Sequence, residues 1–377
     1  MVRIERWVCN TCNKKWIYPI DTCLYCRGKI AKQVGTKAKV VGVTEVFVPS
    51  PLHPIIPYHV LMLQDEHGNK MPKKTIKGYA VGDTYEDKPS SDANTVAIVK
   101  VKYDFEEAVK EALWLIGGLS VDKNTKILIK PNISLPGASY LGICTNEKVL
   151  DGLLAVLKEK GVPSANITVA EQSFFVPLEK AAEKSGILEI LKKYGLGLTD
   201  ISRGVFIGKK EREFSFSIAK IAYDADIIIN LPVIKTDMVL GLDGAFENLT
   251  RFLAKENFES YARDRKKAVQ ALAVLPKVLP QMVILGDGTI GMQGNGPGEY
   301  GEPGFFNMLF GARNPVAHDT VVAEILCLPT IPYVELAGKL GVGEYDLKKI
   351  NVIGNELDSV KRDIKQPIGS KLIKRQE

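Results

Sequence analysis

The sequence predicts an α/β protein: a small N-terminal zinc ribbon and OB-fold β-barrel, then a large, mainly parallel α/β sheet domain with helices on both faces. Two Cys-x-x-Cys pairs stand within the first 26 residues, and strand-like segments follow them to about residue 86. From residue 95 onward, strand-like and helix-like segments alternate. Alternation of this kind is typical of a parallel sheet covered by crossover helices.

Composition is that of an ordinary globular protein long enough for two or three domains. Of the 377 residues, 45% are apolar and 25% are charged. Neither the N-terminus nor the most apolar later segment, 268–285, has the uninterrupted apolar run of a signal peptide or membrane span, so we expect a cytoplasmic protein without a membrane partner. We expect a zinc ribbon at 1–33, an OB-fold at 34–87, a linker at 88–94 and an α/β domain at 95–377.

The strongest motif is a pair of cysteine knuckles at the N-terminus. Cys9 and Cys12 form the first knuckle, and Cys23 and Cys26 form the second. Two such knuckles direct four sulfurs to one point and give a closed tetrahedral site, for which zinc is the expected metal and iron the alternative. Disulfides are disfavoured in a reducing compartment. A closed site leaves no open coordination position, so we expect a structural metal.

Residues 34–86 have a β pattern, with a hairpin turn expected at the sequence DEHGN, residues 65–69. The motifs YPxxxCxxC at 18–26, TxAKVVGxT at 36–44 and VGDTY at 81–85 resemble the domain-of-unknown-function 35 family over residues 1–87. The resemblance implies a rubredoxin-like zinc ribbon, an OB-fold and a thiolase-like or other acyl-CoA enzyme as partner. The chain departs from the family at Cys23-Leu24, where Cys-Pro is usual.

The expected elements of the large domain follow from apolar periodicity and from capping residues. A helix at 104–116 begins with Asp104 and Glu107 as a capping pair, and a helical region at 177–194 is interrupted at Gly186. A further helix covers 146–160, and residues 204–219 read as a hairpin around Lys209, Lys210 and Glu211. Strands are expected at 96–101, 126–130, 167–170, 226–230, 283–286 and 350–353.

Polar residues follow several of these strands, and in an open α/β sheet ligands bind beyond the carboxyl ends of the strands. We therefore expect a shared crevice. Lys130 and Lys235 are candidate anion-binding residues, Glu171 and Asp237 are candidate acids or bases, and His318 is the only histidine after residue 67. Further candidate binding residues are Asn132, Asn230, Thr236 and Asp287.

Two other features bear on this crevice. Residues 286–304 are rich in glycine, so that the loop expected there can bring backbone N–H groups to an anion, with Gly294, Asn295 and Gly296 as candidate contacts. Asp319 is expected to cap the apolar helix that follows it. The carboxylates of Asp237, Glu247 and Asp287 are an alternative set of ligands for Mg²⁺.

Five blocks of the large domain resemble the domain-of-unknown-function 362 family over about 95–355: IKPN at 129–132, NLPVIKT at 230–236, GAFENL at 244–249, DGTIGMQGNGP at 287–297 and NPVAHD at 314–319. The resemblance adds Asn248 to the candidate binding residues. Some members are fused to ferredoxin domains, which implies redox or metal-linked metabolism. This chain has Asp237 and Glu247 where the family usually has His and Lys.

Three classes of function remain open. The first is an enzyme or binding protein for a small anionic metabolite that bears a phosphate, a carboxylate or an acyl thioester. The second is a scaffold whose front module docks an acyl-CoA enzyme. The third is a nucleic-acid-binding protein, since most of the net charge of +6 lies in residues 1–95 and zinc ribbons with OB-folds bind nucleic acids.

Overall fold

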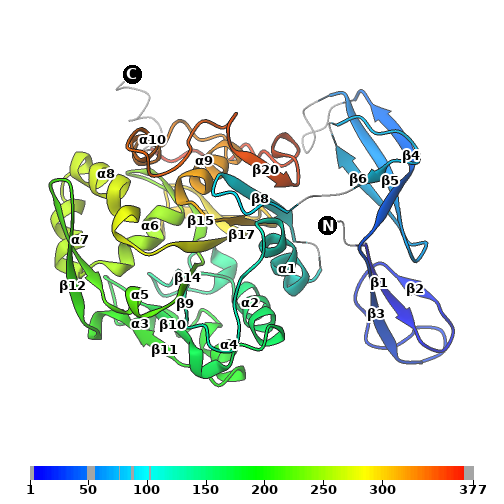
Figure 1. Cartoon of the computed structure of the whole chain (residues 1–377), viewed down its shortest axis with the longest axis horizontal. Helices are drawn as coiled ribbons and strands as arrows, with labels where there is room; N and C mark the ends of the chain where they lie inside the picture. The colour runs from blue at the N-terminus through cyan, green and yellow to red at the C-terminus, as the bar shows by residue number, and fades with distance from the viewer. Residues whose placement is uncertain (1–3, 49–55, 76, 86–88, 102, 369–377) are drawn as a thin grey trace. The chain divides into compact units, whose positions relative to one another are not determined.

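The structure is a computed structural model that describes residues 4–48, 56–75, 77–85, 89–101 and 103–368. The chain divides into two compact units between Pro89 and Ser90, with residues 358–360 grouped with the first. We call them the front unit and the large unit (Figure 1). In the described parts of the chain, no helix is both long enough and apolar enough to cross a membrane.

The front unit begins with a small antiparallel sheet that carries the cysteines. Its strand order is β2-β1-β3, and its core consists of Trp7, Cys9, Trp16 and Cys23. A core this small cannot stabilise a fold by apolar burial alone, which is why a metal site is expected in it. The strands are β1 (Ile4–Cys9), β2 (Lys15–Trp16) and β3 (Ile30–Gly35).

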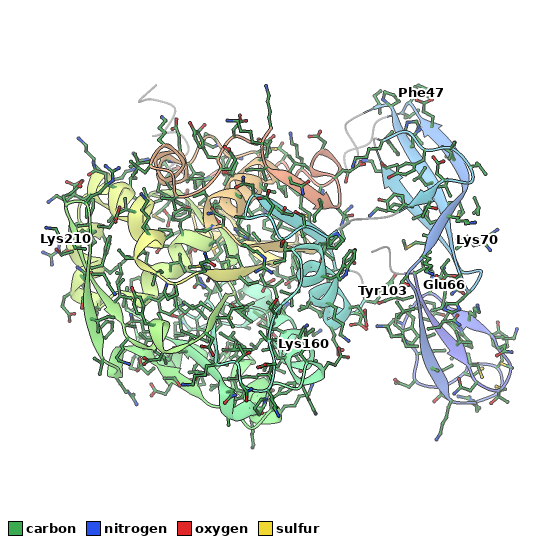
Figure 2. The ribbon with its side chains drawn as sticks, in the orientation of Figure 1. Phe47, Glu66, Lys70, Tyr103, Lys160 and Lys210 are labelled. Carbon is green, nitrogen blue, oxygen red and sulfur yellow. The ribbon has the colours of Figure 1, made fainter. Side chains whose placement is uncertain are left out.

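A second antiparallel sheet completes the front unit, in the strand order β6-β5-β4-β7. The predicted hairpin turn is present: the Asp65 carboxylate accepts hydrogen bonds from the backbone N–H groups of His67 and Asn69, and Gly68 adopts a φ of 73°. Glu66 projects from this turn (Figure 2). The strands are β4 (Ala38–Val46), β5 (Tyr58–Asp65), β6 (Lys70–Thr75) and β7 (Thr84–Tyr85). Among the described residues this is a four-stranded sheet, and the OB-fold stays a prediction.

The large unit is built on one mixed sheet whose main strand order is β11-β10-β9-β14-β17-β19-β8-β20. Pairing is parallel from β11 to β17, antiparallel on both sides of β19, and parallel between β8 and β20. The strands are β8 (Thr95–Lys100), β9 (Ile127–Lys130), β10 (Ile167–Glu171), β11 (Leu198–Asp200), β14 (Ile227–Asn230), β17 (Met282–Gly294), β19 (Met308–Ala312) and β20 (Asn351–Gly354).

Helices cover both faces of this sheet, as predicted. Leu309 of β19 belongs to the apolar core formed with α1 (Phe105–Leu115) and α2 (Glu147–Glu159), whereas the next residue, Phe310, packs edge-on against His318 of α9 (Pro315–Ile325). Consecutive strand residues point to opposite faces, so these helices lie on opposite sides of the sheet. Further helices are α3 (Leu178–Ala182), α4 (Ile187–Lys193), α5 (Ile221–Asp224), α7 (Lys255–Ala262), α8 (Arg265–Val274) and α10 (Pro332–Lys339).

The helix boundaries follow their caps. Asp104 accepts a hydrogen bond from the Glu107 N–H, as expected, and the predicted helix at 146–160 is α2, which Asn146 caps. Gly186, with a φ of 77°, separates α3 from α4. Asn314, and not Asp319, caps α9, because the helix begins at Pro315 and places Asp319 inside it. The prediction for Asp319 was therefore wrong.

The predicted hairpin at 204–219 is present as β12 (Phe206–Glu211) and β13 (Phe214–Ala219). Its turn lies later than expected, because Arg212 adopts a φ of 54° while Lys209, Lys210 and Glu211 continue β12. Lys210 projects outward from this strand (Figure 2).

The segment after β14 and much of the predicted glycine-rich loop are strands. After β14 the chain forms the hairpin β15 (Val233–Asp237) and β16 (Gly241–Asp243), followed by the short helix α6 (Ala245–Leu249). Strand β17 continues to Gly294 and pairs with β15, β19 and β18 (Gly301–Gly304). Its glycines permit close packing, since a Cβ at Gly291 would lie 2.1 Å from the Ile234 carbonyl oxygen.

Candidate functional site

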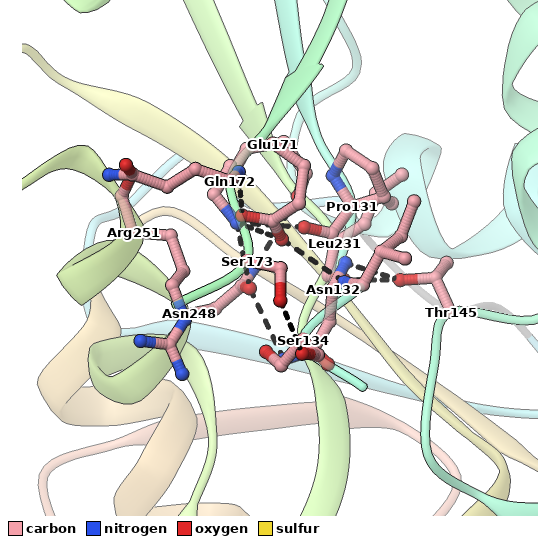
Figure 3. A network of polar contacts seen from close by, with 12 residues as sticks. Pro131, Asn132, Ser134, Thr145, Glu171, Gln172, Ser173, Leu231, Asn248 and Arg251 are labelled. Atoms are coloured by element: carbon pink, nitrogen blue, oxygen red, sulfur yellow. Dashed lines mark hydrogen bonds and ion pairs between the residues drawn. The ribbon is translucent and has the colours of Figure 1, made fainter. Parts of the chain in front are cut away.

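Predicted crevice residues from separate strands meet in one buried cluster, which we call the buried network (Figure 3). The Lys130 Nζ lies 2.6 Å from Glu171 Oε2 and 3.0 Å from Asn248 Oδ1. Asn248 Oδ1 also accepts from Asn132 Nδ2 at 3.3 Å, and its Nδ2 donates to Asn230 Oδ1 at 2.7 Å. Strands β9, β10 and β14 and helix α6 are joined in this way.

The buried network continues to the second lysine. The Lys235 Nζ lies 3.0 Å from Asn132 Oδ1 and 3.1 Å from Asp243 Oδ2 on the paired strand β16. The network consists of Lys130, Asn132, Glu171, Asn230, Lys235, Asp243 and Asn248, all of them buried. Both lysines are thus engaged by protein groups, and neither side chain lines the cavity described below.

The pair formed by Lys130 and Glu171 has its hydrogen bonds satisfied. Glu171 Oε2 also accepts from the Ile133 N–H and Oε1 accepts from the Gln172 N–H, while Lys130 also donates to the Pro131 carbonyl. Burial lowers the pKa of Lys130 to about 8 and raises the pKa of Glu171. Buried charges with complete partners are costly to unpair, which is the behaviour of an architectural element.

Asp287 is also buried and hydrogen-bonded, but it lies outside the buried network. One oxygen of its carboxylate accepts from the Asn146 N–H at 2.7 Å, and the other accepts from the hydroxyl and N–H of Thr289. Asn146 caps α2, so Asp287 ties that helix to β17. Among the described residues, only the four cysteines form a group of three or more ligand side chains close enough for a metal. The predicted Mg²⁺ set of Asp237, Glu247 and Asp287 is not brought together.

The glycine-rich segment is also held by protein groups. The Thr236 hydroxyl donates to the Gly294 carbonyl at 2.7 Å, and the Met238 N–H donates to the Gly296 carbonyl at 2.8 Å. The Asn295 Oδ1 accepts from the Ile368 N–H at 2.9 Å. The first two contacts fix the end of β17 against the hairpin of β15 and β16. The Gly294 N–H, which was expected to face an anion, instead donates to the Lys365 carbonyl at 2.7 Å.

A cavity of about 360 Å³ lies beside the buried network. Its wall is mainly apolar and comes from β13, the hairpin of β15 and β16, and helices α6, α7 and α8. Two carboxylates, Asp237 and Glu247, line it together with Arg263 and Arg265. The other lining residues are Phe216, Val239, Leu240, Thr250, Leu253, Phe258, Tyr261, Ala262, Ala268, Ala271, Leu272 and Leu275. We call this space the cavity.

Both acids of the cavity have pKa values above their ordinary range. Burial raises the pKa of Glu247 to about 8, helped by the negative charge of Asp243 and opposed by Arg251. Burial also raises the pKa of Asp237 to about 6, although its Oδ1 accepts from the Val239 and Leu240 N–H groups. At neutral pH Glu247 therefore holds its proton while most of Asp237 is ionised. An acid and a base with separated pKa values in a concave site are typical of proton-transfer chemistry.

Of the other predicted catalytic residues, His318 is fully buried in α9 and does not line the cavity. Its Nδ1 lies 2.7 Å from Asp319 Oδ1. Asp319 in turn accepts from the backbone N–H groups of Ala245 and Phe246 at the start of α6. Hydrogen bonds through Asp319 therefore link the histidine to the helix that carries Glu247 and Asn248.

In the front unit the four cysteine sulfurs lie within 4.8 Å of one another. The Cys9 and Cys26 sulfurs are 3.4 Å apart and those of Cys12 and Cys23 are 3.6 Å apart, close to the roughly 3.8 Å expected between sulfurs of a tetrahedral zinc site. The backbone N–H of Cys12 donates to Cys9 Sγ and lowers the pKa of that thiol to about 6. The cluster fits a metal ion held by four thiolates.

Comparison with known proteins identifies the large unit. A model of the family described as Domain of unknown function (DUF362) matches residues 127–324, which is more than half of the chain. The chain belongs to the DUF362 family. It is similar to Thylakoid-associated protein sll1697 of Synechocystis sp. (strain ATCC 27184 / PCC 6803 / Kazusa), with 25% identity over 237 residues that make up 60% of this chain and 72% of the relative.

Two solved structures match parts of this DUF362 protein. A structure described as Ltp2-ChsH2(DUF35) aldolase is 17% identical and matches 22% of this chain and 69% of its own, with a TM-score of 0.19. The lactate racemase apoprotein from Thermoanaerobacterium thermosaccharolyticum is 13% identical, with a TM-score of 0.38. That match covers 67% of this chain and 61% of the racemase chain, so the chain spans less than two thirds of the racemase.

The DUF362 sequence blocks divide between the two sites. The blocks around Lys130, Lys235 and Asn248 supply the buried network, whereas Asp237 and Glu247 line the cavity. Sequence reasoning missed the cavity's arginines and its wall of α7 and α8, because these residues carry no motif. Asp237 and Glu247 are the two candidate residues from the sequence that line the cavity.

Proposed function

We propose that the large unit is an enzyme for a small metabolite with an apolar body and an anionic group, and that it acts by proton transfer in the cavity. The observation that carries this proposal is the mainly apolar cavity lined by Glu247 and Asp237, two acids with separated pKa values near neutrality. Arg263 and Arg265 on the cavity wall supply the attraction for the anionic group, in place of the two buried lysines.

In this proposal the two acids have different tasks. Glu247, with a pKa of about 8, donates its proton to an acceptor atom of the ligand, and Asp237, with a pKa of about 6, removes a proton from a donor atom. One proton enters the ligand and one leaves it, so the step changes neither its charge nor its oxidation state. We expect activity to be highest between about pH 6 and pH 8, because only there are both groups in the required form.

A set of eight-carbon probes tests the binding part of the proposal. Octanoate, octanol and octylammonium share an apolar chain and differ in the charge of the head group. We expect octanoate to raise the melting temperature of the protein most and octylammonium least. The variant Leu272→Trp fills the cavity and should abolish the effect of octanoate, whereas Leu188→Trp, at an exposed position outside the cavity, should preserve it. Equal responses to the three probes would contradict the anionic substrate class.

For the front unit we propose structural zinc at Cys9, Cys12, Cys23 and Cys26. The sulfur separations and the N–H groups directed at Cys9 and Cys23 support this assignment. Elemental analysis of the purified protein should find about one zinc per chain, lost in Cys23→Ser and retained in the matched variant Cys144→Ser, which lies outside the cluster. Iron in place of zinc would give a coloured protein and would contradict the choice of metal.

We also propose an acyl thioester as a specific case of the anionic metabolite, and a thiolase-like enzyme as partner of the front unit. The support for both is the resemblance of residues 1–87 to the domain-of-unknown-function 35 family. Co-purification of the full chain from its native cells, followed by mass spectrometry, tests the partner. Recovery of nucleic acid in place of an acyl-CoA enzyme would favour the alternative function.

A further inference from the structure

Helix α6 carries residues of both the buried network and the cavity, yet it has only one and a half turns. It spans five residues, Ala245–Leu249, and the residue before it is Gly244, which has no side chain with which to cap it. A helix this short is unstable by itself, so its position depends on tertiary contacts. The orientation of Glu247 in the cavity therefore requires an anchor from another part of the chain.

Asp319 of α9 supplies contacts at the start of this helix. Its Oδ1 accepts from the Ala245 N–H at 2.8 Å, and its Oδ2 lies 3.2 Å from the Phe246 N. Asp319 thus acts as the N-cap of a helix about 70 residues away in the sequence, where a negative charge is also favoured by the helix dipole. Gly244 makes this approach possible, because a Cβ there would lie 2.5 Å from Asp319 Oδ1.

His318 orients the Asp319 carboxylate. Its Nδ1 lies 2.7 Å from Asp319 Oδ1, and because an ionised carboxylate only accepts hydrogen bonds, Nδ1 carries the hydrogen. On its other side the imidazole lies against the backbone of β17, where a Cβ at Gly286 would be 2.3 Å from His318 Nε2. Within the described residues that Nε2 is buried without a hydrogen-bond partner. The ring is therefore fixed by the Asp319 contact and by close packing.

We propose that His318 and Asp319 are positioning residues that hold α6 so that Glu247 faces the cavity while Asn248 remains in the buried network. This inference rests on the proposed function for the role of Glu247. It gives a physical task to residues of two sequence blocks, since Gly244 and the His318-Asp319 pair form one interlocked contact together with Gly286. Neither His318 nor Asp319 touches the ligand in this arrangement.

The environment of Glu247 makes its position measurable. Its carboxyl group senses Asp243 and Asp237 as negative charges, and Arg251 and Lys235 as positive charges, in addition to burial. Loosening of α6 would reduce the burial of the carboxyl group and change its distance from each of these groups. The titration of Glu247 therefore reports the position of α6 in the protein without any ligand.

The test uses full-length protein labelled with ¹³C at glutamate carboxyl groups, with the Glu247 resonance assigned from Glu247→Gln. In Asp319→Ala we expect the pKa of Glu247 to fall by at least one unit, and hydrogen exchange of the peptide 244–249 to become at least tenfold faster. His318→Leu should act in the same direction. His318→Asn should preserve the wild-type values, because the amide of Asn can replace the Nδ1 donor while leaving Gly286 more room.

Thr320→Val is the matched control, since Thr320 also lies on α9 but its hydroxyl bonds only the Val316 carbonyl. It should leave both readouts unchanged. If Asp319→Ala accelerates exchange while the pKa of Glu247 stays at its wild-type value, the contact is structural and the positioning role is overturned. Unchanged exchange would overturn the anchor itself. Failure of wild-type protein to bind octanoate would instead contradict the proposed function, and the titration would still decide the positioning role.

Discussion

The buried network and the cavity share helix α6 but differ in how their charged side chains are surrounded. Consecutive residues of α6 serve them: Asn248 bonds Lys130, Asn132 and Asn230, whereas Glu247 faces the cavity. In the buried network positive and negative groups are paired at 2.6–3.1 Å. In the cavity two acids line an apolar space, and burial raises both of their pKa values.

The difference shows which of the candidate residues are suited to chemistry. A charge whose partners are complete gains nothing from a ligand and loses its hydrogen bonds if it moves. Burial raises the pKa of Glu171 as well, but Glu171 is enclosed by protein groups, whereas Asp237 and Glu247 border the cavity and can exchange a proton with a ligand there. We therefore assign the predicted catalytic residues Lys235 and Glu171 to architecture, and propose the catalytic role for Asp237 together with Glu247.

The largest effect is expected from breaking the buried network. Lys130→Met leaves the Glu171 carboxylate buried without its cation, and we expect the free energy of unfolding of the large unit to fall by about 3–5 kcal/mol. Urea unfolding followed by circular dichroism measures this loss. The double variant Lys130→Met/Glu171→Leu removes both charges and should recover most of the stability. A loss in Lys130→Met below about 1 kcal/mol would contradict the architectural assignment.

An intermediate effect is expected from Glu247→Gln, with a defined dependence on pH. The folded-state pKa of Glu247 is about 8 and its ordinary value is 4.5, so between these values the folded protein binds more protons than the unfolded chain. This group therefore makes the wild type less stable as pH rises from 4.5 to 8. The glutamine variant lacks that term and should exceed the wild type by on the order of 2 kcal/mol at pH 6, with a larger difference at higher pH.

At pH 4 the wild type and Glu247→Gln should be nearly equal in stability, because Glu247 is then protonated in both the folded and unfolded states. Denaturant unfolding at pH 4, 6, 7.5 and 9 gives the comparison. A constant difference across this range would show that Glu247 titrates normally, and would remove the contrast between the cavity and the buried network.

The smallest effect is expected from Asp237→Asn. The Oδ1 of Asp237 accepts from the Val239 and Leu240 N–H groups in the turn between β15 and β16, and an asparagine side chain keeps this acceptor. At pH 4, where Asp237 is protonated in the folded protein and burial of its charge costs little, we expect the free energy of unfolding to change by no more than about 0.5 kcal/mol, whereas Asp237→Ala should cost about 1 kcal/mol. Catalysis of proton transfer should be lost in both variants, which separates the chemical role of Asp237 from its structural one.

Much of the fold could be predicted from sequence because its signals are local. The caps Asp104 and Asn146 and the break at Gly186 depend on residues within a few positions of one another. The extension of β17 to Gly294 could not be predicted in this way. Its glycines resemble a loop in sequence, and their role in close packing against Ile234 and Phe310 depends on strands brought together by the fold.

The candidate site also combines features that could be predicted from sequence with features that could not. The sequence identified Lys130, Glu171, Lys235 and Asp237 as neighbours, because polar residues that follow parallel strands reach one edge of a sheet. It did not show which of these residues are enclosed by other protein groups and which border the cavity. That distinction depends on α7 and α8, whose residues complete the cavity wall without any motif of their own.

The sequence by itself determined the four-cysteine cluster, the α/β class and the group of polar residues near the strand ends, since each follows from spacing or periodicity within one segment. Only the tertiary structure decided that the two lysines are closed within the buried network, that Asp287 holds α2, and that Asp319 caps α6 and not the helix that contains it. The physical reason is that burial, pairing and pKa depend on which distant segments pack around a side chain.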